Sequence, residues 1–250
     1  MIEEYHRPGE LAAALQLLAR KKPITIPLGG GMVISRRSPE NCAVVDLQEL
    51  GLDQVLSLST GIKIGAATKL QALVENEAVY PGLRDSITRT CSKNHREMAT
   101  LAGTVVTSDG RSVLATALLA FGTDLIWEPG EKTVSLENYF TARSANNFGL
   151  LITNFLVADS DDFRIETVAR TTLDLPQVCV AITKKNKVFR IAIGGFGNSP
   201  RVAYIGSDIP SAIEGVAKAF EFSDDAFASS EYRSAAAKQL TYRLLADMTA

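Results

Sequence analysis

Apolar and polar residues follow each other along this chain with the spacings of both strands and helices. Runs of β-branched residues predict strands, and apolar residues three or four positions apart predict helices. The predicted strands cover residues 24–26, 41–46, 54–58, 61–66, 123–127, 133–135, 150–158, 163–170, 178–184 and 188–193. The predicted helices cover residues 9–20, 69–76 (with Thr68 as N-cap), 113–121, 211–220 and 230–248, and residues 84–98 are expected to be partly helical.

The order of these elements predicts an α+β protein with a division near residue 160. An acidic run, Asp159-Ser160-Asp161-Asp162, marks the boundary. We expect a first region over residues 1–160, made of α/β subdomains at about 1–55 and 56–160. Three strands and two helices then predict a small C-terminal α+β domain over residues 161–250.

Composition and charge narrow the classes of function. Apolar residues make up 46% and charged residues 22%, which is ordinary for a globular protein. A formal net charge of −2 gives no electrostatic case for nucleic acid or an anionic membrane. No apolar run reaches the length of a membrane span, and the first residues lack a signal-peptide core, so we expect a cytoplasmic protein.

Residues able to hold a metal or act as nucleophiles are scarce. The three cysteines, Cys42, Cys91 and Cys179, are far apart, and there are only two histidines. An iron–sulfur cluster needs about four thiolates, so we expect structural thiols and no metal site. No nucleophile with a base and an orienting group is visible either, which favours chemistry carried by a bound cofactor.

Two segments are candidates for holding a phosphate group. Gly29-Gly30-Gly31 directly follows a predicted strand, and glycines there let backbone N–H groups approach a ligand closely. The run is neither G-x-G-x-x-G nor a P-loop, and a tight turn without a ligand is the alternative. Residues 99–112, rich in small and hydroxyl side chains, precede the predicted helix at 113. Together the two segments could hold one diphosphate.

Nine short segments, in the same order, resemble motifs of one family. They are Tyr5–Pro8, Pro27–Gly31, Val44–Leu47, Ile62–Thr68, Met98–Thr104, Leu118–Ala120, Leu173–Pro176 with Arg170 ahead of it, Gly194–Ala203 and Glu231–Arg233. On these residues the chain resembles the FAD-binding medium subunit of the molybdenum hydroxylases, the xanthine dehydrogenase and carbon monoxide dehydrogenase type.

The resemblance implies both a fold and a function. It implies a PCMH-type FAD-binding region of two α/β subdomains, followed by a C-terminal domain with an antiparallel sheet and helices. It further implies an oxidoreductase subunit that passes electrons from iron–sulfur clusters on a partner, through FAD, to an acceptor. The implied partners are a molybdopterin-binding large subunit and a 2Fe-2S small subunit.

The resemblance also implies which residues bind the FAD diphosphate. The first loop supplies Gly29, Gly30, Gly31, Met32 and Val33, chiefly through the backbone. The second supplies Thr100, Leu101, Ala102, Gly103 and Thr104, with Thr107, Ser108 and Ser112 as lesser candidates. No residue is expected to act as a catalytic acid or base.

The chain departs from the family motifs at several of these positions. Met32 and Val33 replace a Thr-Asp pair, Ala102 replaces a glycine, and Val113 replaces an aspartate. These replacements leave a second hypothesis open, in which the chain is a flavin-free structural or assembly subunit of such a complex. A third hypothesis is a flavoenzyme that acts without partners.

Overall fold

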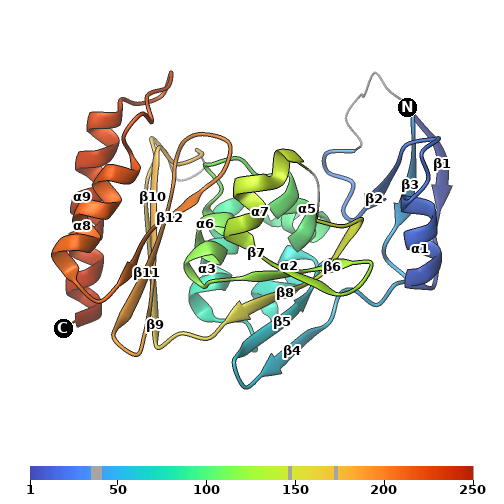
Figure 1. Ribbon diagram of the computed structural model, residues 1–250, viewed down its shortest axis with the longest axis horizontal. Coiled ribbons are helices and arrows are strands. Elements are labelled where there is room, and N and C mark those ends of the chain that lie inside the picture. The colour runs from blue at the N-terminus through green and yellow to red at the C-terminus, as the bar shows by residue number, and fades with distance from the viewer. Residues whose placement is uncertain (35–40, 146–147, 172–173, 250) are drawn as a thin grey trace.

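The computed structural model describes residues 1–34, 41–145, 148–171 and 174–249. Three β-sheets follow one another along the long axis of the molecule (Figure 1). The N-terminal sheet lies at one end, and the last two helices lie at the opposite end. This is the mixed α+β fold that the sequence predicts. Leu173, part of one family motif, lies outside the described residues.

The N-terminal sheet is a small parallel β-α-β unit. Its strands lie in the order β1-β3-β2, and both neighbouring pairs are parallel. The elements are β1 (Ile2–His6), α1 (Leu11–Leu18), β2 (Thr25–Leu28) and β3 (Cys42–Asp46). Ala14 and Leu18 of α1 pack with Val45 and Leu47 in a small apolar cluster, so the helix covers this sheet.

The second sheet has five strands in the order β4-β5-β8-β6-β7, each antiparallel to its neighbours. Its strands are β4 (Val55–Leu58), β5 (Gly61–Gly65), β6 (Asp124–Glu128), β7 (Lys132–Ser135) and β8 (Leu151–Ala158). Between β5 and β6 come α2 (Leu70–Glu75), α3 (Pro81–Thr90), α4 (Lys93–Met98), α5 (Leu101–Val106) and α6 (Val113–Ala120). After β7 come α7 (Leu136–Ala142) and a 3₁₀ turn at Arg143–Ala145.

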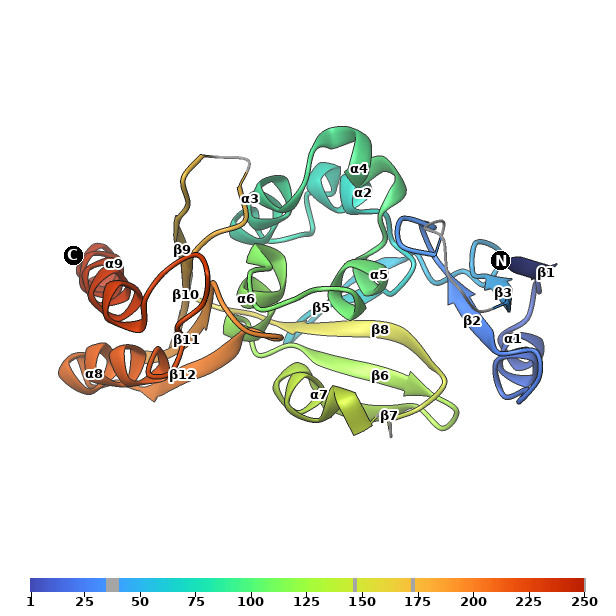
Figure 2. The same ribbon diagram turned by 90° about the horizontal axis from the view of Figure 1, so that it is seen from above.

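The third sheet is antiparallel, in the order β12-β11-β10-β9, and two helices cover one of its faces (Figure 2). The elements are β9 (Asp162–Val168), β10 (Val178–Lys185), β11 (Val188–Gly194), β12 (Arg201–Gly206), α8 (Ile209–Ala219) and α9 (Ser230–Thr249). On β10, Val180 and Ile182 face the α8 and α9 core, whereas Cys179 and Ala181 belong to the core around α6. Because β10 is buried on both faces, its sequence has an unbroken run of apolar residues instead of an alternating pattern.

Helix α6 joins the second and third sheets. All eight of its residues are buried, and its sequence, VLATALLA, is apolar on nearly every side. It packs against β10 and β11 and lies in the same apolar core as Phe155 and Leu125 of the second sheet. A helix that is apolar all round belongs inside a protein, and here it lies between two sheets.

The structure corrects several expectations about local elements. Four elements were not predicted: β1, α5, α7 and β12. Thr68 does not cap α2, because its hydroxyl donates to the Gly65 carbonyl at 2.7 Å and Lys69 holds the N-cap position. The domain limits proposed from the sequence stay a prediction.

Candidate cofactor-binding site

The two glycine-rich and hydroxyl-rich segments lie in direct contact. A Cβ placed on Gly30 would lie 2.0 Å from the carbonyl oxygen of Met98. A Cβ on Gly29 would lie 2.6 Å from Oγ1 of Thr100. The first loop can therefore approach the second this closely only because both positions lack a side chain.

The first loop, residues Gly29–Val33, presents unused backbone donors. Gly31 has a φ of +71°, a left-handed conformation that glycine adopts without strain. Within the described ranges, the amide N–H groups of Gly29–Val33 donate no hydrogen bond to other backbone or side-chain groups. All five residues are at least partly accessible to solvent. An anion could therefore accept hydrogen bonds from this loop.

In the second loop, residues Thr100–Thr104, four of the five backbone N–H groups donate to other protein groups. The N–H of Leu101 donates to Thr68, and the N–H of Ala102 donates to Ala66, each at 3.0 Å. The N–H of Gly103 donates to Oγ1 of Thr100 at 3.2 Å, and that of Thr104 to the Thr100 carbonyl at 2.9 Å. These residues border the first loop, but the N–H groups of Leu101, Ala102, Gly103 and Thr104 are not free for a ligand.

The hydroxyl candidates mostly serve the helices that carry them. Thr104 donates to the Thr100 carbonyl at 2.8 Å, and Thr107 donates to the Gly103 carbonyl at 2.7 Å. Ser108 donates to the Val105 carbonyl at 2.7 Å, and buried Ser112 caps α6 by accepting from the Ala115 N–H at 3.2 Å. Their oxygens keep accepting capacity, so they would be secondary contacts at most.

Lys69 lies where the two loops meet, and sequence reasoning missed it. Its Nζ donates to the Met98 carbonyl oxygen at 2.9 Å, the same atom that contacts Gly30. Its backbone forms an isolated antiparallel bridge with Thr100. A single lysine after a Gly-Ala-Ala-Thr segment has no local pattern that would reveal this position.

The two cysteines with shifted pKa values, Cys91 and Cys179, are not activated as nucleophiles. Burial raises the pKa of the Cys179 thiol to about 12, and burial also raises the pKa of Cys91 against the opposing charge of Arg96. Both cysteines are therefore thiols at neutral pH. Within the described residues, no cluster of three histidine, cysteine, aspartate or glutamate side chains could hold a metal ion.

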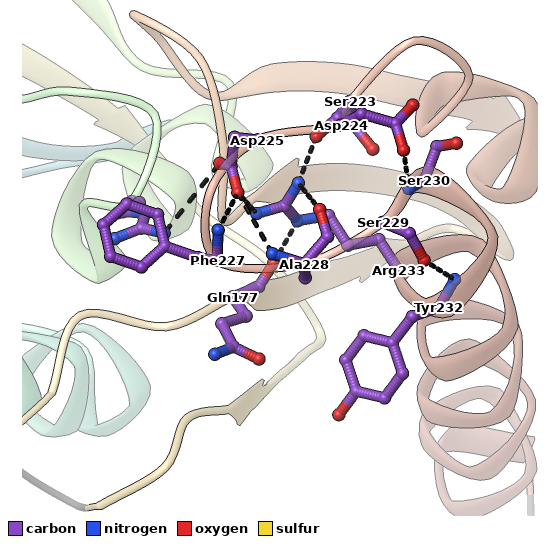
Figure 3. A network of polar contacts seen from close by, with 11 residues as sticks. Gln177, Ser223, Asp224, Asp225, Phe227, Ala228, Ser229, Ser230, Tyr232 and Arg233 are labelled. Atoms are coloured by element: carbon purple, nitrogen blue, oxygen red, sulfur yellow. Dashed lines mark hydrogen bonds and ion pairs between the residues drawn. The ribbon is translucent and has the colours of Figure 1, made fainter.

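Arg111, between α5 and α6, contacts the loop that precedes α9. Its guanidinium carbon lies 3.7 Å from the centre of the Phe227 ring, and its Nη2 lies 3.9 Å from Oδ2 of Asp225. Figure 3 shows the neighbouring network, in which Arg233 also reaches Asp225, at 2.7 Å. The segment that leads into α6 is thus tied to the C-terminal part of the chain.

Residues 1–157, which include both loops and Lys69, match the family described as FAD binding domain in molybdopterin dehydrogenase. The chain belongs to this family. The match to the FAD binding domain family extends from β1 to the end of β8 and leaves out the third sheet.

The chain is also similar to individual curated proteins. YgfM of Escherichia coli K12, an uncharacterized protein, is 31% identical over 142 residues, covering 56% of this chain and 54% of YgfM. The carbon monoxide dehydrogenase medium chain of Afipia carboxidovorans strain OM5 is 27% identical over 149 residues, covering 55% of this chain and 51% of that relative. The matches thus span about half the length of these curated relatives.

The likeness in fold covers nearly the whole chain. A crystal structure of quinoline 2-oxidoreductase from Pseudomonas putida 86 aligns with a TM-score of 0.80 and 19% identity. The alignment covers 98% of this chain and 95% of that one. The fold shared with that structure therefore includes the third sheet and its helices, beyond the part matched by the FAD binding domain family. Among the described residues, no helix is long and apolar enough to cross a membrane.

Proposed function

We propose that this chain is the FAD-binding, electron-transfer subunit of a molybdenum hydroxylase complex. The observation that carries the proposal is the first loop, whose N–H groups lack protein acceptors in the described part of the chain. That loop lies within the part of the chain that belongs to the FAD binding domain family. Free backbone donors beside a second loop fit the diphosphate of FAD.

Each loop would have a different task. The N–H groups of Gly29–Val33 would donate to the diphosphate, and Thr100–Thr104 would form the wall against which the first loop is fixed. When bound, FAD supplies the redox chemistry, so the protein has to bind and orient it rather than supply an acid or a base.

The proposed partners are a molybdopterin-binding large subunit and a 2Fe-2S small subunit. One relative is named a medium chain, which implies an assembly of several chains for that protein. The scarcity of cysteines supports the same division of labour, because a cluster on this chain would need about four thiolates. We place this complex in the cytoplasm.

Two observations favour a second candidate, a flavin-free structural or assembly subunit. The first N–H groups of α5 all have protein acceptors, and Met32 and Val33 offer no polar side chain to a ligand. If the first loop binds no FAD, the chain could contribute to a complex only through its fold and the surfaces that contact partner subunits.

Two measurements on one preparation separate these candidates. The tagged chain is purified from its own cells, the co-purifying chains are identified, and the visible absorbance of oxidised flavin is recorded after incubation with FAD. We expect a yellow protein accompanied by iron–sulfur and molybdopterin chains. A colourless protein with those partners would support the flavin-free subunit, and a yellow protein without partners would support an independent flavoenzyme.

A further inference from the structure

Lys69 is held firmly beside the second loop by main-chain hydrogen bonds. On one side of it, the N–H of Leu70 donates to the Ala99 carbonyl at 2.9 Å. On the other, the N–H of Leu101 donates to the Thr68 carbonyl at 3.0 Å. The side chain therefore starts from a fixed point next to Thr100, with which its backbone is paired.

The ammonium group of Lys69 lies next to the first loop. It donates to the Met98 carbonyl oxygen at 2.9 Å, and the backbone of Gly30 packs on that same oxygen. An ammonium group has three N–H donors, so this bond leaves two of them for another acceptor. Among the described residues, no carboxylate forms an ion pair with Lys69.

We propose that Lys69 binds the diphosphate of the dinucleotide directly and supplies its positive counter-charge. A half-buried lysine with two unused donors beside free backbone N–H groups suits a doubly charged diphosphate better than neutral donors alone. Met32 and Val33 offer the diphosphate no polar side chain, so the Lys69 ammonium group would add a charged contact that the side chains of these two first-loop residues lack. This inference rests on the proposed function.

A purely structural role for Lys69 predicts a different result. If the side chain only fixes the Met98 carbonyl, any donor of similar length should replace it. Lys69→Gln keeps an N–H donor and removes the charge, whereas Lys69→Arg keeps the charge. Comparing these two variants separates phosphate binding from support of the loop.

The test is the equilibrium dissociation constant of FAD, measured by quenching of flavin fluorescence on the full chain at two salt concentrations. We expect Lys69→Gln and Lys69→Met to weaken FAD binding about 10- to 100-fold, the effect of losing one charged hydrogen bond. Lys69→Arg should stay within about threefold of the wild type. The wild type should also lose more affinity with added salt than Lys69→Gln does.

Lys238→Met is the matched control, because it removes the same charge from an exposed position on α9, at the other end of the molecule (Figure 1). It should bind FAD as the wild type does. Wild-type affinity in Lys69→Gln, with folding confirmed by circular dichroism, would overturn the inference and leave the proposed function standing. A wild-type chain that binds no FAD would instead overturn the proposed function, and the inference with it.

Discussion

At the scale of single residues, the three glycines of the first loop have separate reasons to be glycine. Gly30 packs on the Met98 carbonyl, Gly29 packs on Thr100, and Gly31 has a positive φ. The sequence indicates that the backbone approaches something closely here, but it does not reveal that part of this approach is to another loop. Lys69 was missed because its role depends on that same contact.

Gly30→Ala tests this contact. The added methyl group would lie 2.0 Å from a backbone oxygen that cannot rotate away, so the loops must separate. We expect the free energy of unfolding in urea to fall by about 1–3 kcal/mol, together with weaker FAD binding. Gly9→Ala is the control, since a Cβ there meets no atom within 4 Å, and it should change stability by less than about 0.5 kcal/mol. Equal stability of the two variants would contradict the packing described.

At the scale of elements, the sequence predicts the helices and strands that have a clear apolar run or a regular apolar spacing. The apolar runs of β10 and α6 and the spacing of α8 and α9 were sufficient to predict those elements. Strand β1, with the sequence IEEYH, was not predicted because two glutamates interrupt its alternation, and it exists through pairing with β3. Helix α5, LAGTVV, has only six residues, of which Gly103, Thr104, Val105 and Val106 have low helix propensity, and it depends on its contacts with the β5–α2 connection.

The loop before α9 depends on Arg233, which is fully buried (Figure 3). Its guanidinium donates to the carbonyls of Ser223, Ala228 and Gln177 and forms an ion pair with Asp225. Arg233→Met removes all of these hydrogen bonds and the positive partner of Asp225, so we expect a loss of about 2–5 kcal/mol of unfolding free energy.

Arg243→Met is the control for that variant on the same helix. The Arg243 side chain is 58% exposed and pairs with Glu166 at 2.8 Å, so its loss should cost less than about 1 kcal/mol. Chemical denaturation of both proteins measures the difference. A loss at Arg233 no larger than that at Arg243 would show that the buried network does not stabilise this loop.

The Asp225 carboxyl group in the same loop should make the free energy of unfolding depend on pH. Burial raises the pKa of Asp225, but hydrogen bonds from Arg233 and from the N–H groups of Phe227 and Ala228 outweigh it and hold the pKa below its ordinary value. The ionised form therefore stabilises the fold above the ordinary carboxyl pKa, and that contribution is lost as pH falls through the lowered pKa.

Unfolding free energies measured between about pH 6 and pH 2 test this expectation. Asp225→Asn should be less stable than the wild type near pH 6, and the difference should shrink toward pH 2. Asp247→Asn, at an exposed position on α9, should follow the wild-type curve. A difference between Asp225→Asn and wild type that is independent of pH would contradict the role given to the carboxylate.

At the scale of the whole molecule, a single apolar core includes residues from both sides of the boundary that the sequence predicts near residue 160. The core around α6 includes Phe155 and Leu125 of the second sheet and Cys179 and Ala192 of the third. An acidic run between strands predicts a boundary, but a helix packed against two sheets is a long-range arrangement that local patterns do not encode. The candidate site has the same limitation, because its two loops are about 70 residues apart in the sequence.

This shared core predicts that the second and third sheets unfold together. Trp127, the single tryptophan, reports on β6, and far-UV circular dichroism is dominated by helices, including α8 and α9. We expect the two signals to change at the same urea concentration. Two separate transitions would show that the third sheet is an independent domain.

The most direct test of the central claim is equilibrium dialysis of the purified full chain against FAD, with riboflavin, which lacks the diphosphate, as the comparison ligand. We predict that a single FAD binds per chain and that riboflavin binds far more weakly, because the contacts proposed for the first loop and Lys69 are to the diphosphate. Failure to retain FAD, or equal retention of both ligands, would contradict the account.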